Sequence, residues 1–159
     1  MAFSAVMVAL SLALSFFEGL ILPALPIPGI KLGLANIVTL FMLYSLSPTH
    51  TAVVLFSRCA LASLFGGGIT AFSFSVAGGF LALVLMFLSI KSDKFSIYGV
   101  SIIGAAAHSI GQILMACLMF TSFATLMYLP VMLLVSLITG ALIAFVTDTL
   151  LKRLRMFKK

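Results

Sequence analysis

Polar side chains that interrupt long apolar stretches are the residues of this chain that are able to bind a ligand. Lys31, Arg58 and His108 offer cationic or donor groups, which suit a ligand with an anionic or acceptor-rich head. Ionisable groups in apolar surroundings are costly, and at membrane depth they usually face a protein interior or a cavity. The candidate substrate-binding residues are Glu18, Lys31, Asn36, Arg58, His108 and Gln112.

The same inventory argues against catalysis and against a metal site. The chain has three acidic residues, far apart in sequence, so no carboxylate pair is placed to hold magnesium for a diphosphate. A serine nucleophile with His108 as its base lacks a third group. Cys59 and Cys117 fall in apolar runs and are expected to be small packing residues. We therefore expect no enzyme, no cofactor and no metal ion.

Structural roles for the polar residues remain open alternatives. Arg58 and Glu18 are able to form an ion pair across helices, and Lys31 is able to extend to lipid headgroups. His108 and Gln112 are able to satisfy serine hydroxyls or backbone groups. Asp148 is expected to pair with Lys152, one helical turn further on.

Composition identifies an integral membrane protein. The 159 residues are 64% hydrophobic and 8% charged, whereas soluble domains carry about 25% charged residues. Only helices and closed barrels satisfy the backbone in lipid. Barrel strands alternate polar and apolar residues, and runs such as FLALVLMFL at 80–88 do not alternate. The predicted fold is an all-α bundle of transmembrane helices forming one domain over 1–159.

The apolar runs predict six membrane helices, and one irregular segment separates the first two. That segment, Glu18 to Leu40, carries three prolines, two charges and an asparagine, and we expect a proline-stiffened loop at the mouth of a binding site. The second and third helices are short for a hydrocarbon core of about 30 Å. The predicted helices span 3–22, 32–46, 51–65, 69–90, 97–120 and 125–151.

Basic residues predict the orientation of the bundle. Five of the nine Lys and Arg residues lie at 152–159, and positive residues favour the cytoplasmic side. An even number of helices then places both termini in the cytoplasm of a bacterial cell and the 18–31 loop outside. By helical rise, Arg58 and His108 lie about 12 and 15 Å from the cytoplasmic end. The six candidate residues are therefore expected to converge in the outer half of a multi-pass plasma-membrane protein.

Three further segments carry a resemblance to a known family. PGIKLGLANIVTL (28–40), FGGGITAFSFSVAGG (65–79) and GVSIIGAAAHSIGQ (99–112) resemble the Gx transporter family, also called heptaprenyl diphosphate synthase component I. That family is similar to the S components of energy-coupling-factor (ECF) transporters, six-helix proteins that capture vitamin-like substrates. The resemblance implies that an alanine stripe on the first helix docks on an ECF T component driven by two ATPases; the matching residues are Ala5, Ala9 and Ala13.

Two functions follow as expectations. The first is a substrate-binding membrane subunit of a transporter for a small vitamin-, flavin- or quinone-precursor-like molecule. The alternative is a non-transporting membrane subunit or scaffold for heptaprenyl diphosphate and menaquinone synthesis, or for flavin- and quinone-linked electron transfer. Its partner would be a prenyl synthase or a redox protein. Membrane lipids surround the chain in both cases, and the terminal basic cluster indicates anionic lipid, not nucleic acid.

Overall fold

The structure, a computed structural model, describes residues 2–21, 31 and 33–156, and its regular elements are all helices, with no strand in this described part. The all-α prediction is confirmed. Six α-helices are joined by a π-helical turn after the third and a 3-10 helix before the last. The elements are α1 (Ala2–Ile21), α2 (Asn36–Ser45), α3 (Pro48–Ala62), η1 (Ser63–Gly67), α4 (Gly68–Lys91), α5 (Ile97–Phe120), η2 (Phe123–Tyr128) and α6 (Leu129–Met156).

Four segments of the described chain are long and apolar enough to cross a membrane: 2–20, 68–91, 97–120 and 123–154. The two remaining helices are shorter, about 15 Å for α2 and about 22 Å for α3, at a rise of about 1.5 Å per residue. The protein is therefore a multi-pass membrane protein. The short helix α2 is buried from Asn36 to Met42 and lies inside the bundle.

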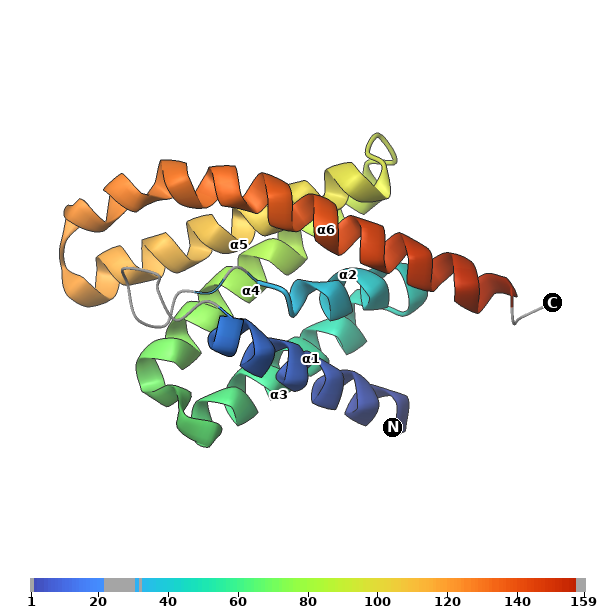
Figure 1. The fold of residues 1–159 in the computed structure, drawn as a ribbon, viewed down its shortest axis with the longest axis horizontal. Coiled ribbons are helices and arrows are strands. Elements are labelled where there is room, and N and C mark those ends of the chain that lie inside the picture. Colours follow the sequence, from blue (N-terminus) through green and yellow to red (C-terminus); the bar gives the residue numbers. More distant parts are fainter. Residues whose placement is uncertain (1, 22–30, 32, 157–159) are drawn as a thin grey trace.

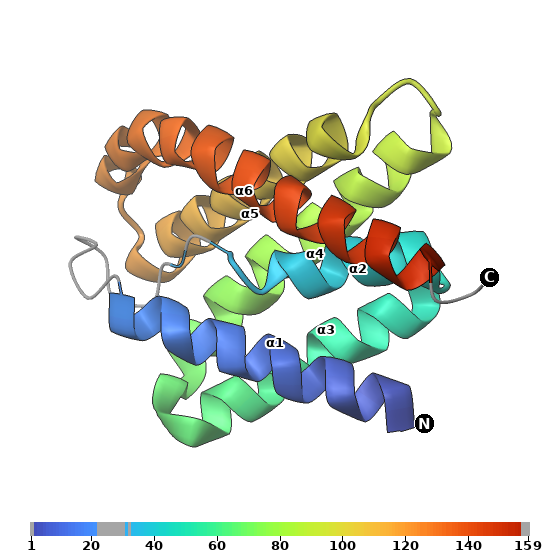
Figure 2. The same cartoon turned by 45° about the vertical axis from the view of Figure 1, so that its right-hand side comes forward.

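The last three long helices, α4, α5 and α6, pack in the order of the sequence. α5 packs against both α4 and α6, α1 packs on α3, and α2 contacts helices of both groups (Figure 1). The start of α1 and the end of α6 lie at the same end of the molecule in both views (Figures 1 and 2). The end of α1 and the α5–α6 connection lie at the other end, which is called the loop end below.

The start of α2 is later than the sequence pattern indicates. The predicted helix begins at Leu32, whereas α2 begins at Asn36 because Gly33 takes a left-handed backbone conformation, with φ of 85°. Most of the predicted proline loop, 22–30, and Leu32 lie outside the described residues. The part that is described, residues 31 and 33–35, therefore enters the bundle without forming a helix, and it is called the entry segment below.

The third and fourth helices are delimited by local signals. Ser47 accepts a hydrogen bond from the His50 main-chain nitrogen, and Pro48 occupies the first turn, so α3 begins before the predicted Thr51. The predicted glycine turn ends at Gly68, whose φ of 64° reverses the chain into α4. Within α6, Asp148 pairs with Lys152 at 2.6 Å, as expected from their spacing.

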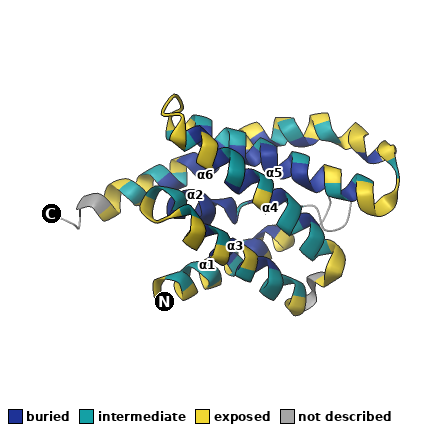
Figure 3. Ribbon diagram, turned by 180° about the vertical axis from the view of Figure 1, so that it is seen from behind, coloured by how far each residue is buried: buried dark blue, intermediate teal, exposed yellow. Residues whose placement is uncertain are grey.

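Burial separates two faces of α1. Ser11, Ser15 and Glu18 are buried against the bundle, whereas the opposite face is exposed (Figure 3). The predicted docking stripe, Ala5, Ala9 and Ala13, lies on this exposed face. Large apolar side chains are also exposed along α6, which is expected where a helix faces lipid.

Candidate functional site

The Glu18 side chain lies at the end of α1 and is only 2% exposed. Its Oε1 accepts a hydrogen bond from the Gly33 main-chain nitrogen at 2.7 Å, and its Oε2 accepts one from the Leu34 nitrogen at 3.1 Å. These N–H groups precede α2, where main-chain donors have no partner within the helix and negative charge is favourable. Glu18 therefore caps the buried start of α2 from a neighbouring helix.

Gly33 lets the entry segment pass through a narrow space. A Cβ atom at this position would lie 2.9 Å from Asn36 Nδ2 and 2.9 Å from His108 Cδ2. Its positive φ is also costly for any residue with a side chain. A glycine is required here on both counts, and the segment runs directly against α5.

Gln112 of α5 holds the main chain of Lys31. With the amide oriented to satisfy its neighbours, Nε2 donates to the Lys31 carbonyl at 2.8 Å, and Oε1 accepts from the Lys31 nitrogen at 3.2 Å. The same Oε1 accepts from His108 Nε2 at 3.2 Å. Gln112 therefore fastens the entry segment, and His108, one turn earlier on α5, supports the amide.

Two glycines allow α4 to approach these residues. A Cβ atom on Gly78 would lie 2.8 Å from both Gln112 Cγ and the His108 carbonyl oxygen. A Cβ atom on Gly111 would lie 2.6 Å from the Ala77 carbonyl oxygen. The glycines within the SVAGG and HSIGQ stretches thus hold α4 and α5 in close contact and bury the His108–Gln112 pair.

Two cations lie beside this fastened segment. Arg58 on α3 is 5% exposed, and its described hydrogen bond runs to the weak acceptor Cys59 Sγ at 3.8 Å. The Lys31 side chain, in the loop before α2, is half-buried. Burial lowers the pKa of Lys31 below its ordinary 10.5; the nearby Glu18 charge raises it, and Arg58 lowers it further. The Arg58 charge thus disfavours the charged form of Lys31.

A cavity of about 310 Å³ lies between the end of α1 and the end of α3, with Lys31 in its wall. Lys31 is the charged residue among its described lining residues, and the other walls are mainly apolar. This volume is at the lower end of the range of small-molecule sites. The lining residues are Ser15, Phe16, Gly19, Leu20, Lys31, Ala62 and Phe65.

The structure brings the six predicted residues into one region, but gives them different surroundings. Glu18, Lys31, Asn36, His108 and Gln112 gather along the entry segment, and Arg58 adjoins them from α3. Of the six, Lys31 also lines the cavity. For Gln112 the geometry shows the structural alternative, because its amide bonds the main-chain groups of Lys31.

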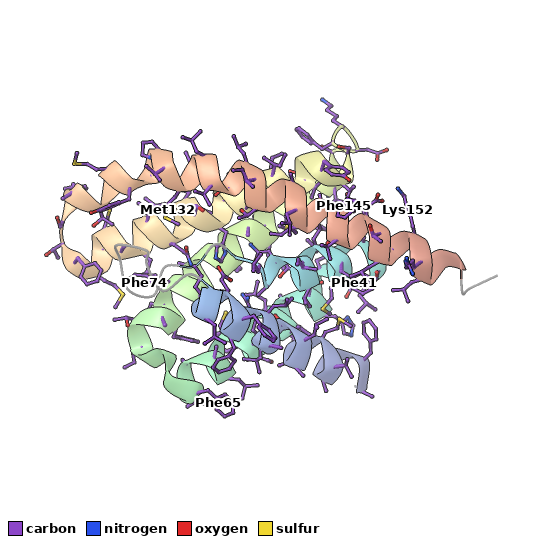
Figure 4. The ribbon with its side chains drawn as sticks, in the orientation of Figure 1. Phe41, Phe65, Phe74, Met132, Phe145 and Lys152 are labelled. Carbon is purple, nitrogen blue, oxygen red and sulfur yellow. The ribbon has the colours of Figure 1, made fainter. Side chains whose placement is uncertain are left out.

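Sequence reasoning missed the apolar walls of the cavity. Phe16, Leu20 and Phe65 carry no chemical signal that separates them from lipid-facing residues. The small pair Ser15 and Gly19, at helical spacing, is the one feature that hints at an open space beside α1. Figure 4 shows Phe65 at the lower edge of the molecule, in the η1 turn between α3 and α4.

Some buried polar atoms in this region have no hydrogen-bond partner. They include both amide atoms of Asn36 and the Nδ1 atom of His108. An unpaired buried polar group costs about 1–3 kcal/mol. Asn36 and His108 therefore keep unused hydrogen-bonding capacity within the described structure.

Comparison with known protein families gives one match. The model of the heptaprenyl diphosphate synthase component I family matches residues 7–150. The matched range contains all the described residues of the candidate site. Comparisons with curated proteins and with solved structures give no match.

Proposed function

The chain belongs to the heptaprenyl diphosphate synthase component I family, and we propose that it is the substrate-binding membrane subunit of a transporter in the bacterial plasma membrane. The observation that carries this proposal is the placement of Lys31 in the wall of a cavity at the loop end, with Arg58 one helical turn before the lining residue Ala62. Two neighbouring cations in apolar surroundings favour an anionic or acceptor-rich ligand. The substrate would be a small vitamin-, flavin- or quinone-precursor-like molecule.

In this proposal the chain binds but does not catalyse. Glu18, Gln112 and His108 hold the entry segment and so keep Lys31 at the cavity wall. The exposed alanine face of α1 would dock on an ECF T component with two ATPases, because small side chains permit close helix contact in lipid. The positive-inside bias of the Lys and Arg residues would place the cavity on the outer side.

A retained ligand tests the proposal directly. Native mass spectrometry of the gently solubilised protein should detect a small molecule in the wild type and its loss in Arg58→Ala. Lys94→Ala, which removes an exposed charge from the α4–α5 connection, is the matched control and should retain the molecule. A spectrum with only membrane lipid in all three proteins would contradict the proposal.

A second candidate function takes its first form from the family's description, a membrane subunit or scaffold for heptaprenyl diphosphate synthesis. Such a subunit would use the same helices to hold a prenyl synthase, or a redox partner if it serves flavin- and quinone-linked electron transfer. Co-purification separates the two functions. A T component with ATPases supports transport, and a prenyl synthase or redox protein supports the scaffold.

A further inference from the structure

The walls of the cavity also face the surroundings of the protein. Phe16, Leu20 and Phe65 line the cavity, yet they are 51%, 75% and 66% exposed. In a multi-pass membrane protein, exposed apolar side chains of this size face lipid. The cavity therefore opens sideways, between the end of α1 and the turn after α3, towards the acyl chains.

Small residues keep this side opening free. Gly19 on α1 and Ala62 on α3 both line the cavity. A Cβ atom added to Gly19 would meet no atom within 4 Å, so the space beside it is open. A chain-like ligand would be able to pass between the two helices at this point.

Positive charge lies at the inner side of the cavity. Lys31 is in the wall, and Arg58 precedes the lining residue Ala62 by one helical turn on the same face of α3. Glu18 is the nearby carboxylate, and both its oxygens already accept main-chain hydrogen bonds. The sequence's other acidic residues, Asp93 and Asp148, lie at the far end of α4 and in the second half of α6. The cavity thus combines an inner cationic end with an apolar side exit.

We propose that the ligand is a membrane-borne amphiphile with an anionic head and a single apolar chain. It enters from the bilayer between α1 and α3, with its head at Lys31 and Arg58 and its chain along Phe16, Leu20 and Phe65. This inference rests on the proposed ligand-binding function and adds the class of ligand and its route. A volume of about 310 Å³ holds the head and the start of the chain, and the rest remains in lipid.

Binding of a model amphiphile to the full chain in phosphatidylcholine nanodiscs tests this inference. Radiolabelled dodecyl phosphate should bind above the level of empty nanodiscs, and radiolabelled inorganic phosphate should not. Lys31→Met removes the headgroup contact and should weaken binding about tenfold or more. Gly19→Leu should do the same by filling the side opening, without a clash that would unfold the protein.

Ala5→Leu and Lys94→Met are the matched controls, near the start of the exposed face of α1 and in the α4–α5 connection, and both should bind as the wild type does. Equal binding of inorganic phosphate would overturn the amphiphile while leaving a ligand-binding subunit in place. Dodecyl phosphate binding that survives both Lys31→Met and Gly19→Leu would overturn the site. If dodecyl phosphate does not bind but native mass spectrometry finds another retained molecule, the inference fails and the proposed function stands.

Discussion

The Glu18 carboxylate lies 2.7 Å from the main-chain nitrogen of Gly33, which joins the end of α1 to the segment that enters α2. A second bond to Leu34 completes the cap. α2 has only 10 residues and begins inside the bundle, and the Gly33 and Leu34 N–H groups form the turn that leads into it. This carboxylate is therefore a structural requirement for the short helix, whatever else it contacts.

Removing the Glu18 cap should destabilise the empty protein. Glu18→Ala leaves the buried Gly33 N–H and the half-buried Leu34 N–H without acceptors, at up to about 1–3 kcal/mol each. Glu18→Gln keeps one acceptor oxygen, so its melting temperature should fall less than that of Glu18→Ala. Thermal unfolding in detergent without ligand measures both changes. Asp148→Asn removes an acid from an exposed ion pair on α6 and should have the melting temperature of the wild type. Equal decreases in melting temperature for Glu18→Ala and Asp148→Asn would contradict the capping role of Glu18.

The Gln112 amide should control the order of the entry segment. Gln112→Leu removes both bonds to the Lys31 main chain, so hydrogen exchange at 31–35 should speed up while exchange within α4 stays unchanged. Ser109→Ala breaks a buried bond to Ser136 on the α6 side of the same helix. In that control, faster exchange should appear at α6 and not at 31–35. Unchanged exchange at 31–35 in Gln112→Leu would show that the amide does not hold the segment.

Gly111 should tolerate no side chain. In Gly111→Ala the new Cβ meets main-chain atoms of Ala77 and Gly78, so α4 must shift, and we expect a loss of about 1–3 kcal/mol. Gly99→Ala on the same helix meets its nearest atom, on Phe95, at an ordinary 3.4 Å. It should be neutral or slightly stabilising through helix propensity. Equal melting temperatures of the two variants would refute the close α4–α5 contact.

Lys31 should make the stability of the empty protein depend on pH. Burial lowers its pKa below 10.5, so the folded state loses this proton before the unfolded state does. The penalty for the buried charge is then complete below the folded pKa and fades as pH rises towards 10.5. Lys31→Met should melt above the wild type at neutral pH, and the gap should narrow at alkaline pH. A gap that stays constant with pH would exclude Lys31 as its cause.

The exposed alanine face of α1 should matter for transport and not for binding. Ala9→Trp places a bulky side chain on that face, far from the cavity-lining residues of α1, so uptake of the retained molecule should stop while its binding persists. Val6→Trp adds the same bulk at an exposed position beside the stripe, and this variant should still take up the molecule at the wild-type rate. Uptake that survives Ala9→Trp would remove the docking role.

Composition and apolar run length were sufficient for the membrane class, the all-α fold and the helix that spans Ile97–Phe120, because lipid permits few backbone solutions. The sequence also predicted that the six polar candidates lie in one region, because polar groups at membrane depth usually face the protein interior or a cavity. These residues are Glu18, Lys31, Asn36, Arg58, His108 and Gln112. The start of α2 was not, because its cap comes from another helix.

Only the tertiary structure decided what each polar group does. Gln112 bonds the main chain of Lys31, which is 81 positions away. The type of a side chain does not reveal which distant main-chain group it will bond. The cavity was equally hidden, because its walls are Phe and Leu residues of the kind that face lipid everywhere else. Sequence therefore determines which groups must leave the lipid, and the packing of α1, α3 and α5 determines which of them fasten the chain and which face open space.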